Sequence, residues 1–382
     1  MIHPFPRYGL KQLAHSTKQR ELMFIVNDTS RHCGCRVNDQ IKWKGMRAML
    51  LQNELIQLVV LLDKGSEIIQ FLYKPLDVDF IWRGPNTLQN PEHFVPTGGS
   101  GASSFFDHWS GGWFEVLPNG GPACEYKGAV LGNFAETINL PWEYQILENT
   151  PEQICVGLWV RTYRTPFLLQ KILRLKTGVA ALFIEERVTN EGAEPVEFMW
   201  GHHPVVGAPF LDENCRLYAP DCTVEVLDAE DGPDHRMGLH QVGKWPTIKD
   251  RDGGRLDLRI IPPPTDRTMD NCYLKEFKEG WIAIQNPNRK VGFGLAWDQS
   301  VFRYMWIWQA FGGGIGYPWY GRTYNIGIEP WTSYPCAGLT EAVARGTAVH
   351  LESGCSLDAW LTATVFTGDH EVHQILRDGT VN

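Results

Sequence analysis

The sequence lacks the signals that mark several classes of protein. No apolar run approaches the roughly 20 residues that a membrane-spanning helix needs. The N-terminus has no basic start followed by an apolar stretch, which a secretory signal requires. No cluster of Lys or Arg stands out, and the net charge is −9, so the phosphate backbone of a nucleic acid is a poor partner. We therefore expect a cytoplasmic protein that binds neither membrane nor nucleic acid.

Paired metal-binding cysteines are also missing. The chain has nine Cys, but Cys33 and Cys35 are separated by a single residue, too few for a zinc knuckle, and no second pair follows. Reduced and mostly buried thiols are the simpler interpretation. We expect no cofactor and no metal ion.

Helical periodicity is scarce. No segment longer than about a dozen residues keeps a helical period, and no alternation of strands with helices is visible. Short apolar runs bounded by turn residues recur instead, at 55–62, 68–73, 154–163, 167–175, 181–190, 196–200, 281–286, 291–297, 302–308, 323–330 and 359–366. Such runs predict an all-β fold, a large antiparallel β-sandwich.

We predict one domain over residues 1–382, with 1–48 as a mixed N-terminal lead-in. The hydrophobic content of 43% is sufficient for a large core. Two Gly-rich segments with embedded aromatic residues, 98–122 and 312–321, are expected to place side chains at a site rather than to build the core.

Tryptophan is abundant, with 15 residues in the chain. Many must fill the core, because Trp is large and apolar, but the indole also offers a flat surface to the face of a sugar ring. The density of Trp therefore favours a carbohydrate ligand.

Two titratable groups lie in apolar, strand-like runs. Glu329 sits between Ile328 and Pro330, where an ionised carboxylate needs compensation; the alternative is the solvent face of an edge strand, which Pro330 would allow. His203 can carry a proton near neutral pH. A proton acceptor and a proton donor brought together are what ring opening of a sugar hemiacetal requires.

The neighbouring His202 leaves alternatives open. Successive side chains of a strand point to opposite faces, so His202 and His203 cannot easily bind one metal ion. A core histidine satisfied by the backbone is one alternative. Another is that His202, rather than His203, faces the site.

Two segments carry a family resemblance: Trp200-Gly201-His202-His203-Pro204 and Asn325-Ile326-Gly327-Ile328-Glu329-Pro330-Trp331-Thr332. They resemble the aldose 1-epimerase (galactose mutarotase-like) superfamily, nearest to its divergent bacterial branch of unassigned sugar epimerases. The resemblance covers roughly residues 50–366 and implies that family's large β-sandwich, the supersandwich. It implies Glu329 as the general base and His203 as the acid that protonates the ring oxygen.

Other landmarks of the family are partly retained. Leu140-Pro141-Trp142 is present, but the His-Gly pair expected before it is replaced by Phe134-Ala135 or Gly132-Asn133, so a substrate-positioning histidine is missing or supplied by His108. Asn119 is retained without the Arg that follows it in the family. Asp270 matches the aspartate that binds sugar hydroxyls, and an aromatic platform is expected from Trp109, Trp113, Trp308 or Trp331. The predicted substrate-binding residues are Asp270, His202, Asn119, Trp109, Trp113, His108 and Trp331.

The resemblance implies an aldose 1-epimerase-like isomerase, a mutarotase, acting on a sugar or modified sugar, and a homodimer is possible. Two alternatives stay open. One is a non-catalytic carbohydrate-binding protein on the same fold, and the other is a different carbohydrate isomerisation or elimination that uses the same base.

Overall fold

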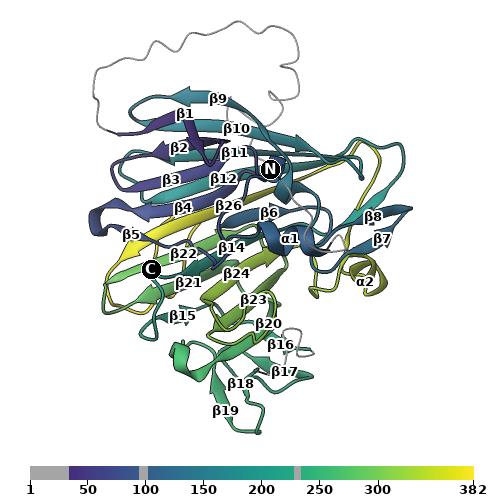
Figure 1. The fold of residues 1–382 in the computed structure, drawn as a ribbon. Coiled ribbons are helices and arrows are strands. Elements are labelled where there is room, and N and C mark those ends of the chain that lie inside the picture. The colour runs from purple at the N-terminus through teal and green to yellow at the C-terminus, as the bar shows by residue number, and fades with distance from the viewer. Residues whose placement is uncertain (1–33, 94–101, 228–233) are drawn as a thin grey trace, which may run out of the picture.

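Two large antiparallel sheets face each other in the computed structural model, which describes residues 34–93, 102–227 and 234–382 (Figure 1). The pairs that build both sheets are antiparallel. The β-sandwich predicted from the turn-bounded runs is confirmed, and no parallel sheet flanked by helices occurs in these residues.

The larger sheet has 14 strands, ordered β1-β2-β3-β4-β6-β14-β24-β23-β20-β16-β17-β18-β19, with β5 paired to β4. Its strands are β1 (Arg36–Trp43), β2 (Met46–Gln52), β3 (Ile56–Leu61), β4 (Glu67–Tyr73), β5 (Val78–Asp79), β6 (Trp113–Val116), β14 (Gly201–Gly207), β16 (Thr223–Val226), β17 (Gln241–Lys244), β18 (Thr247–Lys249), β19 (Arg255–Asp257), β20 (Thr268–Lys275), β23 (Tyr304–Phe311) and β24 (Tyr324–Trp331).

The smaller sheet has eight strands, ordered β15-β21-β22-β26-β12-β11-β10-β9. They are β9 (Glu143–Asn149), β10 (Gln153–Arg161), β11 (Phe167–Lys176), β12 (Ala181–Asn190), β15 (Arg216–Tyr218), β21 (Trp281–Asn286), β22 (Val291–Trp297) and β26 (Ser356–Thr367). Two small sheets pair β13 (Val196–Phe198) with β25 (Val349–Leu351), and β7 (Cys124–Tyr126) with β8 (Ala129–Leu131).

Helices are few and short in the described residues. They are α1 (Ala102–His108), α2 (Leu339–Ala344) and the 3₁₀ helices η2 (Lys74–Leu76), η3 (Pro91–His93), η4 (Thr137–Asn139) and η5 (Pro264–Asp266). None of the described helices has the length and apolar character that a membrane crossing would need.

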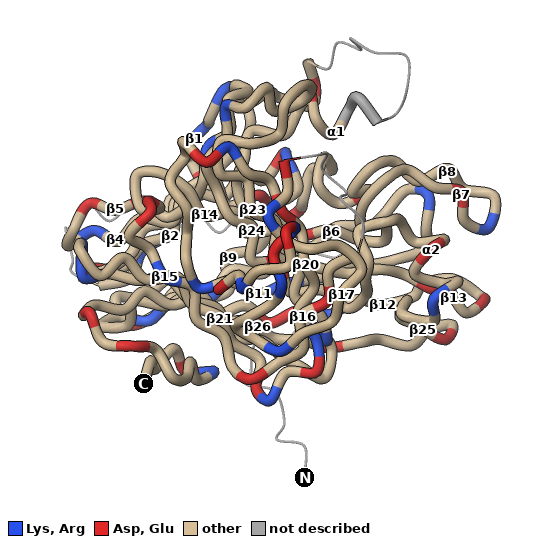
Figure 2. The backbone as a smooth tube through the Cα atoms, turned by 90° about the horizontal axis from the view of Figure 1, so that it is seen from below, with Lys and Arg blue, Asp and Glu red and all other residues tan. Residues whose placement is uncertain are grey.

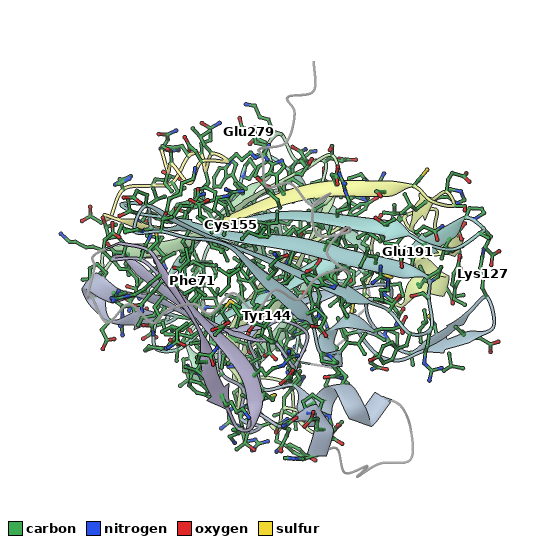
Figure 3. All side chains as sticks on the ribbon, turned by 90° about the horizontal axis from the view of Figure 1, so that it is seen from above. Phe71, Lys127, Tyr144, Cys155, Glu191 and Glu279 are labelled. Atoms are coloured by element: carbon green, nitrogen blue, oxygen red, sulfur yellow. The ribbon has the colours of Figure 1, made fainter. Side chains whose placement is uncertain are left out.

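Apolar side chains of both sheets fill the space between the layers (Figure 3). Phe71 of β4 meets Phe293 of β22 edge to face, with 5.3 Å between the ring centroids. A second apolar cluster covers the outer face of the larger sheet and contains Trp82, Trp109, Trp306, Trp308 and Trp331. The central strands are therefore covered on both faces, and all seven residues of β14 are buried. Burial of this apolar surface is the main term that stabilises the fold.

The predicted lead-in of residues 1–48 lies partly outside the described residues. Its described end holds β1 and the start of β2, so the larger sheet already begins at Arg36. The eight cysteines of the described residues form no disulfide with one another. Acidic and basic residues alternate along the backbone in Figure 2 without a long stretch of basic residues.

Candidate active site

A cavity of about 560 Å³ opens on the outer face of the larger sheet. Its floor comes from β14, β20, β23 and β24. Its walls come from the two Gly-rich segments 98–122 and 312–321, of which the first contains α1, and from residues 133–134 and 336–337. The lining residues are Phe105, Phe106, Trp109, Gly121, Pro122, Asn133, Phe134, His203, Asn271, Trp306, Trp308, Gly314, Ile315, Tyr317, Pro318, Trp319, Glu329, Cys336 and Ala337.

Strand register brings His203 and Glu329 to this cavity. In the pair formed by β14 and β24, Gly201 lies opposite Trp331 and Val205 opposite Gly327, which places residues 203 and 329 level with each other. Both side chains point outward, because residues two apart on a strand share a face. Nε2 of His203 lies 3.3 Å from Oε1 of Glu329. A carboxyl and an imidazole in contact at the floor of a cavity can give and take protons at one ligand atom or at two adjacent ones.

Trp331 holds the Glu329 carboxyl in place. The indole Nε1–H donates to Oε2 of Glu329 at 3.2 Å, which leaves Oε1 directed at His203. The indole is stacked on Trp306, with ring centroids 3.9 Å apart and planes 11° from parallel. A Cβ added to Gly120 or Gly201 would overlap with the Trp331 ring. Trp331 is fully buried and is not among the residues that line the cavity. It positions the carboxyl from behind and does not face the cavity, where its contact with substrate was predicted.

Gly327 gives the Glu329 side chain its room. The two residues share a face of β24, and the carboxyl folds back over Gly327, so that a Cβ at this position would overlap with Oε1. The carboxyl of Glu329 can therefore occupy this position only because residue 327, two positions earlier on the strand, has no side chain.

Replacement of Gly327 with alanine is expected to slow any proton transfer by the pair of Glu329 and His203 by about 10- to 100-fold, because an added methyl group displaces Oε1 from His203 by a fraction of an ångström or more. Steady-state kinetics measure the effect, and circular dichroism checks the fold. Gly132→Ala serves as the control, since its backbone has no positive φ and an added Cβ there meets only Cβ of Ala135, at 3.7 Å, an ordinary van der Waals contact. Activity equal to wild type in Gly327→Ala would contradict the steric role.

His203 is enclosed by aromatic rings. Phe114 is stacked on the imidazole at 4.6 Å, and Trp109 and Phe134 meet it edge to face at 5.2 and 5.7 Å. Burial lowers the pKa of His203 to about 3, because a low-dielectric surrounding disfavours the imidazolium. The imidazole is therefore uncharged near neutral pH in the empty cavity. The expectation that it carries a proton at that pH is not supported by this environment.

His202 points the other way, into the space between the sheets. Its Nε2 lies 2.8 Å from Oε2 of Glu186 on β12, and Nε1–H of Trp113 donates to its Nδ1 at 3.2 Å. The structure therefore places His202 and Trp113 between the sheets and not at the cavity, where their substrate contacts were predicted. Strand alternation, which separated the two histidines on sequence, places His203 at the cavity and His202 in the core.

A buried polar cluster surrounds His202 and joins the two sheets. Nζ of Lys171 lies 3.2 Å from Oε2 of Glu115, and Nε1–H of Trp200 donates to Oε1 of Glu115 at 2.7 Å. Burial raises the pKa of Glu115 and of Glu186 to about 7 and lowers that of His202 to about 4.

The same cluster contains the one set of candidate metal ligands found in the described residues. One ligand atom each from Glu115, Glu186 and His202 lies within 4.8 Å of the others. The positive charge that these carboxyls face is the ammonium of Lys171. The set is closed off from solvent by the two sheets, and we interpret it as a charge-compensated part of the core.

Asp270 does not reach the cavity, contrary to the prediction. It lies opposite Gln309 in the pair of β20 with β23, and its carboxylate accepts from Nε of Arg236 at 2.6 Å and from the backbone N–H groups of Arg236 and Met237. Its neighbour Asn271, opposite Trp308, lines the cavity. The resemblance thus pointed to a strand that reaches the cavity, but Asp270 lies on the opposite face of that strand from its neighbour Asn271.

Asn119 and His108 also lie away from the lining of this cavity, where their substrate contacts were predicted. The amide of Asn119 donates to the carbonyls of Pro122 and Gly132, and its oxygen accepts from the N–H of Leu339, so it holds the loop together. His108, at the end of α1, lines a separate small recess beside Lys64 and Ile138.

Trp109 is the member of the predicted substrate-binding set that lines the cavity. Its ring lies 5.4 Å from that of Trp308 and 5.1 Å from that of Trp319. Trp319 and Phe134 were missed by sequence analysis, and Trp308 was named only as one of four candidates for an aromatic platform. Trp306 and Trp308 occupy alternate positions of β23, a spacing that places both on one face and could have indicated the platform.

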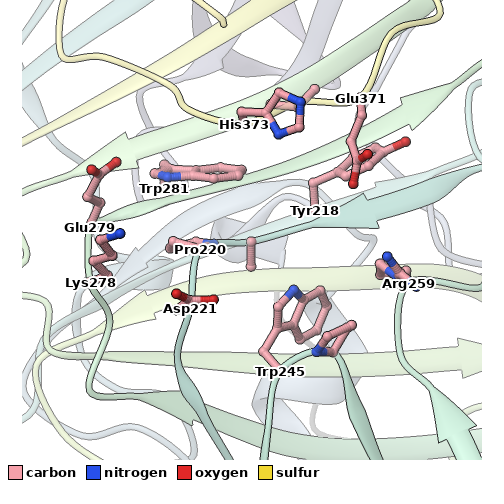
Figure 4. A pocket seen from close by; sticks show the side chains of 13 residues that line it. Tyr218, Pro220, Asp221, Trp245, Arg259, Lys278, Glu279, Trp281, Glu371 and His373 are labelled. Atoms are coloured by element: carbon pink, nitrogen blue, oxygen red, sulfur yellow. The ribbon is translucent and has the colours of Figure 1, made fainter.

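A second cavity, of about 280 Å³, lies near β15 and β21 (Figure 4). Trp245 and Trp281 line it together with acidic and basic side chains, among them Asp221, Arg259 and Lys278. It shares no lining residue with the cavity at Glu329, and none of the predicted site residues lines it.

Comparison with known proteins gives a family and a fold. Residues 43–365 match the model of a family described as "Domain of unknown function (DUF4432)". No curated protein matches the chain. Among solved structures, a Klebsiella pneumoniae protein described as a "putative aldose 1-epimerase" has a TM-score of 0.69 at 15% identity, over 88% of this chain and 84% of that one.

Two further structures are similar. A galactose mutarotase-like protein from Clostridium acetobutylicum has a TM-score of 0.61 at 12% identity, over 87% of this chain and 99% of that one. A galactose mutarotase related enzyme from Lactobacillus acidophilus has a TM-score of 0.56 at 17% identity, over 86% and 100%. At these identities the likeness establishes the fold, and the predicted galactose mutarotase-like sandwich is confirmed.

Proposed function

The chain belongs to the DUF4432 family, and from its mutarotase-like fold we propose that it is an aldose 1-epimerase-like isomerase that interconverts sugar anomers. The observation that carries the proposal is the contact between Nε2 of His203 and Oε1 of Glu329 at the floor of the cavity. The two oxygens of a hemiacetal carbon are closer to each other than an ordinary hydrogen bond is long. A sugar lying across the pair can therefore present its anomeric hydroxyl to one group and its ring oxygen to the other.

Ring opening needs one proton removed and one delivered. A proton leaves the anomeric hydroxyl, another reaches the ring oxygen, and the C1–O5 bond breaks to give the open-chain aldehyde. Rotation about C1–C2 and closure on the other face reverse both transfers. In the roles implied by the family resemblance, Glu329 takes the first proton and His203 delivers the second.

The pair must hold one transferable proton for this cycle. Because burial lowers the pKa of His203 to about 3, the uncharged imidazole is favoured in the empty cavity, and the shared proton then resides on Glu329. From that state the ring opens when His203 accepts the proton of the anomeric hydroxyl and Glu329 delivers one to the ring oxygen, so the two roles are exchanged relative to those that the resemblance implies. On closure Glu329 takes the proton back from the former ring oxygen and His203 returns one to the anomeric oxygen. Both directions use the same two atoms, as microscopic reversibility requires.

The pH dependence of kcat/KM tests which protons the pair carries, because this constant reports titration of the enzyme with an empty cavity. A second proton binds the pair only near pH 3, where His203 titrates, so the acidic limb of the enzymatic rate is expected there. No limb from His203 is expected between about pH 5 and 8, because a group with a lowered pKa stays deprotonated above that value. Rates corrected for spontaneous mutarotation measure this. An alkaline limb near pH 6.5 that disappears in His203→Asn would contradict it.

A single NMR screen distinguishes anomer interconversion from the two alternatives, non-catalytic sugar binding and a different carbohydrate isomerisation or elimination. Exchange spectroscopy detects anomer interconversion, and solvent deuterium uptake detects removal of a carbon-bound hydrogen, which mutarotation leaves in place. A non-catalytic binding protein would give neither signal. An elimination or an epimerisation next to a carbonyl would give deuterium uptake. The cytoplasmic location and a homodimer stay predictions from the sequence.

A further inference from the structure

The cavity around Glu329 and His203 is built mainly from aromatic rings. Eight of its nineteen lining residues are Phe, Tyr or Trp. Trp109, Trp308 and Trp319 pack on one another, and Phe134 packs on the imidazole of His203. Such walls offer flat apolar surface and few hydrogen bonds. A ligand that presents hydroxyl groups in every direction would leave several of them without partners.

Several polar atoms of the lining are engaged within the protein. Nε1–H of Trp109 donates to the carbonyl of Gly111, and Nε1–H of Trp306 to that of Ser333, both at 2.9 Å. Oδ1 of Asn133 accepts from the N–H of Ala123, and the Tyr317 hydroxyl donates to Asp107. The polar residues that the family resemblance assigned to hydroxyl binding, including Asp270 and Asn119, face away.

The charged groups of the lining also indicate an uncharged ligand. No Lys or Arg is among the lining residues in the part of the chain that the structure describes, so a phosphate or carboxylate on the sugar would find no cation there.

We propose that the substrate is an uncharged deoxy sugar, an aldose that lacks one or more of the hydroxyl groups of a common hexose. This inference rests on the proposed function for its reaction, while the ligand class rests on the cavity walls alone. The deoxygenated part of the ring lies against Trp308, Trp319 or Phe134, and the hemiacetal end lies on Glu329 and His203. Each missing hydroxyl removes a group that these walls would leave unpaired.

Matched sugars that differ by one oxygen test the ligand class. The pairs are 6-deoxygalactose with galactose and 2-deoxyglucose with glucose. Galactose 6-phosphate and galacturonate are the charged sugars of the comparison. Titration calorimetry with Glu329→Gln, which cannot turn over, gives Kd for each sugar. We expect at least one deoxy sugar to bind about 10- to 100-fold more tightly than its parent, and the charged sugars to bind more weakly than either. Equal or tighter binding of both parents, or of a charged sugar, would overturn the inference.

Turnover by wild type separates the two proposals. Faster anomer exchange of a deoxy sugar than of its parent supports both. Equal exchange of parent and deoxy sugar overturns the ligand class and leaves the isomerase. Tighter binding of deoxy sugars without exchange of any sugar supports the ligand class and overturns the isomerase.

Phe134→His tests the wall directly. Phe134 stacks on Phe105 and lies beside His203, so a polar ring at this position adds a hydrogen-bonding group inside the cavity. The kcat/KM ratio of deoxy sugar to parent is expected to fall at least about fivefold, by partial loss of that discrimination. Tyr163→His, at a side chain 76% exposed, is the matched control and keeps the wild-type ratio. An unchanged ratio in a folded Phe134→His would overturn the role of the wall, and Phe134→Asn repeats the test should the first variant not fold.

Discussion

Glutamine in place of Glu329 is expected to lower kcat for anomer exchange by about 10²- to 10⁴-fold, the range that one positioned proton-transfer group contributes. Glutamine has the shape of glutamate and can still face the N–H of Trp331, but it can neither accept the anomeric proton nor deliver one. The transfer occurs only in the transition state, so KM should change far less than kcat. NMR exchange rates across substrate concentrations give both constants.

Two controls make this outcome decisive. Glu191→Gln removes an exposed carboxylate that pairs with Arg161 and should leave kcat unchanged. Thermal unfolding should show that Glu329→Gln is folded at the assay temperature. A folded variant with a wild-type rate would exclude Glu329 from the chemistry, and a shift in sugar affinity without any turnover in wild type would favour the non-catalytic alternative.

Methionine in place of Lys171 is expected to cost about 3–5 kcal/mol of unfolding free energy near pH 8. Lys171 faces Glu115 between the sheets with both side chains almost fully buried, and its ammonium also lies over the Trp142 ring at 4.6 Å. Methionine keeps the length and removes the charge. The carboxyls of Glu115 and Glu186 would then lack their nearest cation in a setting that water does not reach.

The loss should depend on pH with a definite sign. In the folded protein the pKa of both carboxyls is raised from 4.5 to about 7, so the folded state binds more protons than the unfolded state in that window. Their contribution to stability therefore falls as pH rises through it. Without Lys171, which lowers both values, the window extends upward. Lys171→Met should thus be closer to wild type at pH 5 than at pH 8.

Chemical denaturation at both pH values measures this difference. Lys127→Met, at an exposed pair with Glu194, should change stability by less than about 0.5 kcal/mol. Addition of Glu115→Gln to Lys171→Met should recover part of the loss, because the uncompensated charge is removed. A loss that is the same at pH 5 and pH 8 would show that packing against Trp142, rather than charge, is what Lys171 contributes.

The fold could be predicted from the sequence because its strands are local patterns. Runs such as 167–175 and 181–190 are apolar, short and bounded by turns, and both became long strands of the smaller sheet. The pairing order could not be predicted in this way, since β6, β14 and β24 are neighbours in the sheet and lie far apart in the chain. Long-range pairing depends on how the faces of the two sheets pack together, which no local pattern contains.

Sequence alone could indicate which residues come together where a residue type has one physical use, but not where the face of a strand decides. Glu329 and His203 are costly to bury without a partner, and the structure places them in contact with each other. Asp270 and Asn271 are equally polar neighbours, so only the register against Gln309 and Trp308 tells which one faces the cavity. Asn119 was selected by resemblance alone, and its hydrogen bonds lie within its own loop.

The division of the cavity between strands and loops bears on how such proteins diversify. Glu329 and His203 lie on central strands whose opposite faces are packed in the core, where most substitutions would unfold the protein. Phe134, Trp319 and the residues of α1 belong to connecting segments, which tolerate replacement and insertion. Natural selection can therefore exchange the walls, and with them the preferred sugar, while the acid–base pair is inherited intact. Relatives that share Gly-x-Glu and the adjacent histidines should accordingly differ first in the length and aromatic content of these loops.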